Sequence, residues 1–235
     1  MTKTSTRPKA RVPAERAQRF IFAPRAGNPR LSREEQKAQR AQALLEAAWA
    51  MFCESGYEAL TIEAVAERAG FSRQPVYTLF GDMQNLFYEL QRRATIEVVD
   101  LLFTHLRPDA SLRENLKQVA QVVAAELNSD KPAYGERLFI VAQTIALSRP
   151  EIAAKLQEQA RWVIGEIARI IRRSPLAKGE VLRSEPEVIA AHLAAHINGL
   201  TTVQFQTGQR FASADDLAAL FLYCAFKSPA PAAGK

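Results

Sequence analysis

Apolar residues along this chain recur at spacings of three and four, which is the period of a helix with one buried face. In the first such segment Leu44, Leu45, Ala48, Trp49 and Phe52 share a face. No segment combines β-branched residues with the strict alternation of a half-buried strand. The pattern therefore predicts an all-α fold. The helices are expected at about 33–54, 62–68, 73–79, 83–105, 112–128, 135–147, 150–173, 186–207 and 214–226.

Serines mark where several of these helices should begin. A serine followed three residues later by an acid can accept an amide of the first turn while the acid accepts the serine's own amide. This pattern opens apolar periodic segments at Ser32/Glu35, Ser111/Glu114, Ser148/Glu151, Ser184/Glu187 and Ser213/Asp216. We expect each of these serines to cap a helix.

The segment from Leu60 to Phe80 has the features of two short helices joined by a tight turn. Thr61 is a good N-cap, and Gly70 can adopt the left-handed conformation that ends the first helix. Ser72 is expected to cap the second helix, which carries Val76 inward. The segment fits a helix-turn-helix, although an ordinary helical corner in a bundle could share these features.

The surrounding residues favour the helix-turn-helix because the chain resembles the TetR family over about Gln42–Leu90. The first helix ends in FCESGYEALT, the turn reads ERAGFS, and a Ser-x-x-x-Val-Tyr-x-x-Phe pattern runs from Ser72 to Phe80 before GDMQNLF. We expect three segments in this chain. Basic residues and prolines indicate a flexible arm (1–30), and the resemblance implies a three-helix DNA-binding domain (31–81) and a helical effector-binding and dimerisation domain (82–235).

The resemblance also implies which side chains would meet DNA. The helix that opens at Ser72 would lie in the major groove, with Arg73, Gln74 and Thr78 facing bases. Ser72 itself is also a candidate DNA contact. Tyr77 and Thr61 would contact phosphates. The chain departs from the family at Met83, where the fourth helix normally begins with a phosphate-binding lysine. It departs again at Leu79, a position that is usually aromatic or histidine.

Charge is distributed very unevenly along the chain. Residues 1–30 hold eight bases and one acid, whereas residues 31–93, which include the helix-turn-helix, hold seven bases and nine acids. The first segment could be a solubilising tail, or it could be an arm that binds DNA phosphates. Because the helix-turn-helix lacks positive charge of its own, we favour the arm. Its candidate contacts are Arg7, Arg11, Arg25 and Arg30.

By the same resemblance, the last two long helices would form a homodimer interface, and the middle helices would enclose a ligand. The interface candidates are Leu193, Ile197, Leu217, Leu220 and Phe221. The pocket candidates are Phe103, Phe139, Gln143, Trp162, Asn198 and Phe205. Taken alone, each pocket candidate is better explained as a core residue than as a ligand contact.

His192 and His196 stand one helical turn apart, but no carboxylate or cysteine is spaced to complete a metal site. We therefore expect no metal and no cofactor. Nor does the sequence contain a nucleophile elbow, a phosphate loop or a plausible pair of catalytic carboxylates, which argues against an enzyme.

The expected function is that of a TetR-type DNA-binding transcriptional regulator. We expect a repressor that binds a near-palindromic operator in double-stranded DNA and is released by a small-molecule effector of unknown identity. A ligand-independent or nucleoid-like DNA-binding protein is the alternative. With no apolar run long enough to span a membrane and no secretory signal pattern, a cytoplasmic protein is expected. The resemblance implies that it is a homodimer.

Overall fold

The structure is a computed structural model that describes residues 32–128 and 132–227. Helices account for nearly all of the regular structure in these residues, and the single extended pairing is an isolated bridge between Leu182 and Phe226. The all-α prediction is therefore confirmed. In chain order the elements are α2 (Arg33–Ser55), η1 (Tyr57–Ala59), α3 (Ile62–Arg68), α4 (Gln74–Phe80), α5 (Met83–Thr104), α6 (Leu112–Asn128), α7 (Pro132–Ser148), α8 (Pro150–Arg173), α9 (Pro186–Thr207) and α10 (Ala214–Ala225).

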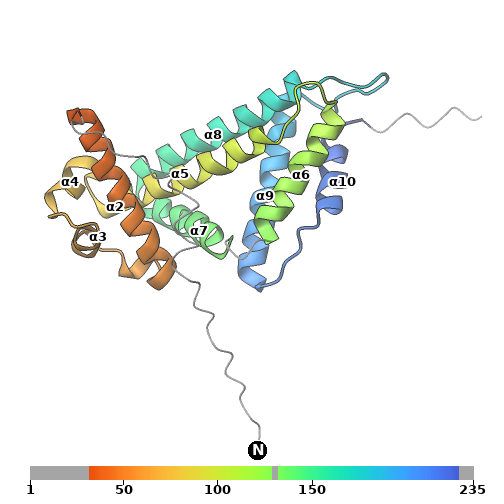
Figure 1. The fold of residues 1–235 in the computed structure, drawn as a ribbon. Coiled ribbons are helices and arrows are strands. Elements are labelled where there is room, and N and C mark those ends of the chain that lie inside the picture. Colours follow the sequence, from red (N-terminus) through yellow and green to blue (C-terminus); the bar gives the residue numbers. More distant parts are fainter. Residues whose placement is uncertain (1–31, 129–131, 228–235) are drawn as a thin grey trace, which may run out of the picture. The chain divides into compact units, whose positions relative to one another are not determined.

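The chain divides into two compact units after Leu90, within α5. In the first unit, α2 packs against η1, α3 and α4 (Figure 1). Aromatic side chains pack together in this unit. The ring of Phe87 makes edge contacts with the rings of Phe52 and Tyr57, at centroid distances of 5.5 and 4.9 Å. Leu44 and Leu45 of α2 are completely buried, as the apolar spacing predicts.

Three of the five predicted serine caps are confirmed. Ser32 forms a full capping box with Glu35, and the hydroxyls of Ser111 and Ser213 accept the amides of Glu114 and Asp216.

The predicted caps Ser148 and Ser184 are wrong. The residues at the cap positions of α8 and α9 are Arg149 and Glu185, and neither helix has a side-chain cap. Prolines explain the difference, because Pro150 and Pro186 occupy the first helical position. Because proline favours the first helical position, the residue before it takes the cap position, and each predicted serine falls one residue outside that position.

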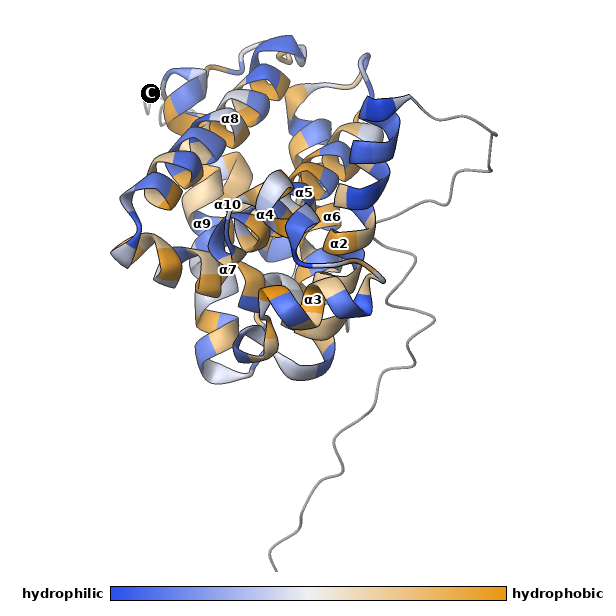
Figure 2. Ribbon diagram, turned by 90° about the vertical axis from the view of Figure 1, so that its left-hand side faces the viewer, coloured by the Kyte–Doolittle hydropathy of each residue, from blue (hydrophilic) through white to orange (hydrophobic). Residues whose placement is uncertain are grey.

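The second unit is a helical bundle. α6 and α10 lie side by side, and α8 packs against both α7 and α9 (Figure 1). The ribbon of α8 alternates between orange and blue along its length in Figure 2, as expected for a helix that buries one apolar face. The core of this unit is formed chiefly by α6, α9 and α10, where Leu116, Leu193 and Phe221 are almost completely buried.

Two buried amide side chains connect loops to this core. Asn115 donates to the carbonyls of Arg107 and Ala110 and to the hydroxyl of Ser174. Gln204 of α9 donates to the carbonyl of Leu127 at 3.2 Å, and its oxygen accepts the amides of Phe211 and Ala212 at 3.1 and 3.2 Å. Gln204 therefore joins the end of α6 to the loop that precedes α10.

Replacing Gln204 with leucine should lower the free energy of unfolding by about 2 kcal/mol or more, because a carbonyl and two amides would lose their partner inside the protein. Gln206→Leu is the matched control, since Gln206 is exposed on the same helix. Urea denaturation followed by circular dichroism measures both variants. Equal stability of the two variants would contradict a structural role for Gln204.

Candidate functional site

The two short helices of the first unit form the helix-turn-helix geometry that the sequence predicts. Gly70 has a φ of +76°, in the left-handed region, and the amide of Phe71 returns to the carbonyl of Ala66 at 2.9 Å. Val65 and Ala66 on α3 and Val76 on α4 are at most 1% exposed. Small, buried residues at this contact allow α3 and α4 to pack closely, so the outer face of α4 is fixed relative to α3.

The outer face of α4 carries hydrogen-bonding side chains. Arg73, Gln74, Tyr77 and Thr78 are all exposed, with Tyr77 at 49%. The hydroxyl of Thr78 donates to the carbonyl of Gln74 at 2.9 Å. These side chains present donors and acceptors that suit base edges and phosphates in a DNA groove.

The two predicted caps of this segment have different outcomes. Thr61 is confirmed as the N-cap of α3, its hydroxyl accepting the amide of Ala64 at 3.1 Å. Ser72 does not cap α4: the helix begins at Gln74, Arg73 occupies the cap position, and no side chain caps the helix. Arg73 has helical backbone angles, and α4 begins one residue later than predicted. The exposed hydroxyl of Ser72 thus has no capping role.

Carboxylates hold both arginines of this segment. Arg68 forms a bidentate pair with Glu54 of α2, with both nitrogen–oxygen distances at 2.6 Å. These hydrogen bonds lower the pKa of Glu54 and raise the pKa of Arg68. Arg73 pairs with Glu63 of α3 at 2.9 Å.

Glu63 and Arg73 are not separated by the three or four residues that bring side chains together on one helix. The sequence pattern therefore did not reveal this pair. Both side chains are more than half exposed, at 55% for Glu63 and 64% for Arg73. Such a pair adds little stability. In this structure it orients the Arg73 guanidinium toward Glu63.

The arm residues Arg7, Arg11, Arg25 and Arg30 lie outside the described residues. Their proposed contacts with DNA remain a prediction from the sequence.

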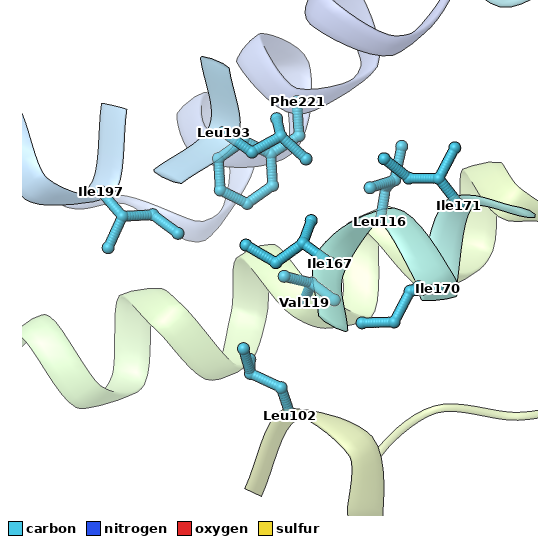
Figure 3. Close-up of a pocket in the computed structure, with 9 residues that line it drawn as sticks. All are labelled: Leu102, Leu116, Val119, Ile167, Ile170, Ile171, Leu193, Ile197 and Phe221. Atoms are coloured by element: carbon cyan, nitrogen blue, oxygen red, sulfur yellow. The ribbon is translucent and has the colours of Figure 1, made fainter. Parts of the chain in front are cut away.

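An apolar cavity of about 20 Å³ lies in the second unit (Figure 3). Only aliphatic and aromatic side chains from α5, α6, α8, α9 and α10 line it. They are Leu102, Leu116, Val119, Ile167, Ile170, Ile171, Leu193, Ile197 and Phe221. Pockets for drug-sized ligands measure about 300–1,000 Å³, so a ligand that entered here would have to displace side chains.

None of the six predicted pocket residues lines this cavity. Gln143, Trp162, Asn198 and Phe205 are exposed, whereas Phe103 and Phe139 are half-buried. The guanidinium of Arg169 lies 4.5 Å from the centre of the Phe103 ring. A role for these six residues in ligand binding stays a prediction.

The predicted interface residues face mainly inward. Leu193, Leu217 and Phe221 are at most 2% exposed and belong to the core of the unit, while Ile197 and Leu220 are half-buried against it. The three buried residues are therefore unavailable to a partner chain in this conformation. Apolar periodicity identified the core-facing side of α9 and α10, and it could not tell that side from a partner-facing side.

Metal-ligating side chains do not gather in groups of three or more anywhere in the described residues. His196 bonds through Nδ1 to the carbonyl of His192, one turn earlier on the same helix. Within the same residues, no helix is long and apolar enough to span a membrane.

Residues 44–90 match the family model described as bacterial regulatory proteins of the tetR family. The matched segment contains α3, α4 and about half of α2. The segment that matches the family model therefore includes the exposed face of α4 described above.

Two characterised relatives are transcriptional regulators. The HTH-type transcriptional activator FasR of Mycolicibacterium smegmatis is 26% identical over 133 residues, or 57% of each chain. The HTH-type transcriptional repressor AcnR of Corynebacterium glutamicum is 36% identical over 61 residues, which are 26% of this chain and 32% of that protein. The matched segments thus span about half of one relative and a third of the other.

Solved structures share the fold over most of the chain. A protein of Mesorhizobium loti assigned to the TetR family aligns with a TM-score of 0.65 at 21% identity, covering 82% of this chain and 99% of that one. The multidrug binding protein EbrR, solved with imidazole, aligns with a TM-score of 0.64 at 18% identity, covering 87% and 100%.

The Glu63–Arg73 pair leads to a prediction about DNA selectivity. Glu63→Gln and Glu67→Gln each remove one exposed negative charge from α3, but only the first releases Arg73. Both should raise affinity for random-sequence duplex DNA to a similar extent. Glu63→Gln alone should reduce the preference for a preferred binding site, selected from a random pool of duplexes, over random DNA. We expect a reduction of about fivefold or more, because one well-placed base contact discriminates on this scale.

Fluorescence polarisation with a duplex that contains the selected site and with a random-sequence duplex measures this preference. Equal selectivity of the two variants would show that Glu63 does not position Arg73. Higher selectivity of Glu63→Gln would show that Glu63 withholds Arg73 from DNA.

Proposed function

Because the N-terminal unit of this chain belongs to the TetR family of bacterial regulatory proteins, we propose that the protein is a DNA-binding transcriptional regulator. The observation that carries this proposal is the exposed face of α4, with Arg73, Gln74, Tyr77 and Thr78 held on a buried α3–α4 contact. In this proposal α4 enters the major groove, and Tyr77 and Thr61 contact the phosphates beside it. The protein acts where the chromosome lies, in the cytoplasm.

A homodimer would place two copies of α4 in successive major grooves, about 34–36 Å apart. We place the interface on the exposed side of α9. There an exposed stripe at helical spacing consists of Val188, His192, Ala195, Gly199 and Val203. The small residues in this stripe would let a symmetry-related helix approach closely. A two-fold dimer of this kind matches a near-palindromic operator.

The second unit is proposed to bind a small-molecule effector. The alignment with EbrR, which binds imidazole in its crystal structure, supports a ligand-binding role for a bundle of this fold. We favour a repressor that its ligand releases from DNA, in which the ligand binds the conformation with weaker DNA affinity. The relatives include both an activator and a repressor, so the direction of regulation needs its own test. A ligand-independent DNA-binding regulator is the alternative.

The basic segment 1–30 is proposed to supply affinity that the helix-turn-helix lacks. Arg68 and Arg73 both pair with carboxylates, and residues 31–93 contain more acids than bases. Specific DNA binding nevertheless draws much of its free energy from phosphate contacts by basic side chains. The eight bases of residues 1–30, including Arg7, Arg11, Arg25 and Arg30, are the largest local excess of positive charge in the chain.

Selection of bound duplexes from a random pool tests the proposed function. The protein should enrich an inverted repeat whose half-sites are about one helical turn apart. Gly199→Glu should convert a dimer to a monomer in sedimentation velocity and lower affinity for the enriched repeat at least tenfold, because two carboxylates would meet across the interface.

Gly165→Glu is the matched control on α8. Gly165 and Gly199 are both exposed helical glycines, and no neighbouring atom would lie within 4 Å of a Cβ added at either position. Enrichment of no sequence would contradict the regulator. An enriched repeat with Gly199→Glu still dimeric would contradict the placement of the interface.

A further inference from the structure

Buried amide side chains in the second unit differ sharply in how their polar atoms are satisfied. Asn115 and Gln204 make hydrogen bonds through both their nitrogen and their oxygen. Gln91 donates from its nitrogen to the hydroxyl of Thr95 at 3.0 Å. Gln159 of α8 is 8% exposed, and neither its nitrogen nor its oxygen has a hydrogen-bond partner among the described residues.

Gln159 interrupts the apolar face of α8. Ile152, Leu156, Val163 and Ile170 recur on the same side of this helix at spacings of three, four and seven, and none of the four is exposed. Folding removes both ends of the Gln159 amide from water without providing a replacement, which disfavours the folded state. Leucine would fill a similar volume on this face without that penalty. An amide at this position is therefore better explained by a binding role than by packing.

The face that contains Gln159 continues to the apolar cavity. Ile167 and Ile170, which line the cavity, follow two to three helical turns later on α8 (Figure 3). At 1.5 Å per residue, Ile167 is about 12 Å from Gln159 along the helix axis. A ligand bound at Gln159 can thus extend along apolar side chains toward a place where packing is already incomplete.

We propose that Gln159 is the polar anchor of the effector site, and that the effector is a neutral molecule with an amide group on an apolar body. This inference rests on the proposed function, since it assigns ligand chemistry to the effector-binding unit. A primary amide side chain offers one acceptor beside one donor. The complementary ligand group also has a donor beside an acceptor, as in a carboxamide or a lactam.

A neutral ligand fits this part of α8 better than a charged one. Buried charges require a partner of opposite sign. The helix face formed by Ile152, Leu156, Gln159, Val163 and Ile170 carries none. The apolar body would extend from the amide toward Ile167 and the cavity.

Thermal unfolding with a matched pair of probes tests the proposal. Octanamide has both a donor and an acceptor on a medium alkyl chain, whereas 2-nonanone has a similar chain and an acceptor only. Octanamide should raise the Tm of the full-length protein by several degrees, and 2-nonanone should raise it by less than half as much. Gln159→Leu should abolish the octanamide shift. Gln157→Leu, at an exposed glutamine on the same helix, should retain it.

The Tm without probe provides a second readout. Gln159→Leu should equal or exceed the wild-type Tm, because leucine removes an amide whose hydrogen bonds are unmet. A drop of several degrees would show that Gln159 has a structural role and would overturn the proposal. The proposal also fails if octanamide does not stabilise the wild type, or if it stabilises Gln159→Leu equally well.

Affinity for the selected inverted repeat is measured on the same protein samples. Intact DNA binding without an octanamide shift would overturn the amide anchor and leave the DNA-binding function standing. Absence of DNA binding by the wild type would contradict the proposed function, whatever octanamide does.

Discussion

Pairing of the arginines in the helix-turn-helix with carboxylates constrains the DNA binding that we propose for this protein. Glu54 holds Arg68 through two hydrogen bonds, and Glu63 holds Arg73 at the start of α4. These pairs orient the two guanidinium groups, and they offset positive charges that would otherwise attract phosphates. The unit is thus organised for directional contacts with bases. General attraction to DNA has to come from elsewhere in the chain, and residues 1–30 carry the charge to provide it.

Buried amide side chains in the second unit differ in whether they hydrogen-bond to the rest of the fold. Asn115 and Gln204 use their amides to fix loops, and their removal would leave backbone groups unpaired. Gln159 is buried on the apolar side of α8 and has no hydrogen-bond partner among the described residues. This contrast within one bundle supports the proposal that α8 carries the polar anchor of an effector site. The apolar cavity farther along α8 supports the same view.

Local sequence signals predicted the fold well. Apolar spacing of three and four, together with Thr61, Gly70 and several serines, placed the helices because these signals act within one or two turns. The signals failed where neighbouring residues competed. Pro150 moved the cap of α8 from Ser148 to Arg149, and Leu193 proved to face the core of its own protomer. A single apolar pattern cannot show whether a buried face meets the same chain or a second copy.

The Glu63–Arg73 pair joins two helices across a turn, so no period reveals it. The polar break at Gln159 was visible in the pattern of α8, but its significance required knowledge of its hydrogen bonds.

The central claim is that the helix-turn-helix selects the sequence while the basic segment 1–30 supplies much of the affinity. Titrating operator binding against salt for the full chain and for a chain lacking residues 1–30 tests it most directly. Each phosphate contact contributes about 0.9 to the slope of log affinity against log salt concentration. Loss of the contacts of Arg7, Arg11, Arg25 and Arg30 should reduce that slope by about three to four and weaken binding at least tenfold near physiological salt, with the preferred sequence unchanged. An unchanged affinity and slope would contradict the claim and show that the described helix-turn-helix binds DNA without the basic segment.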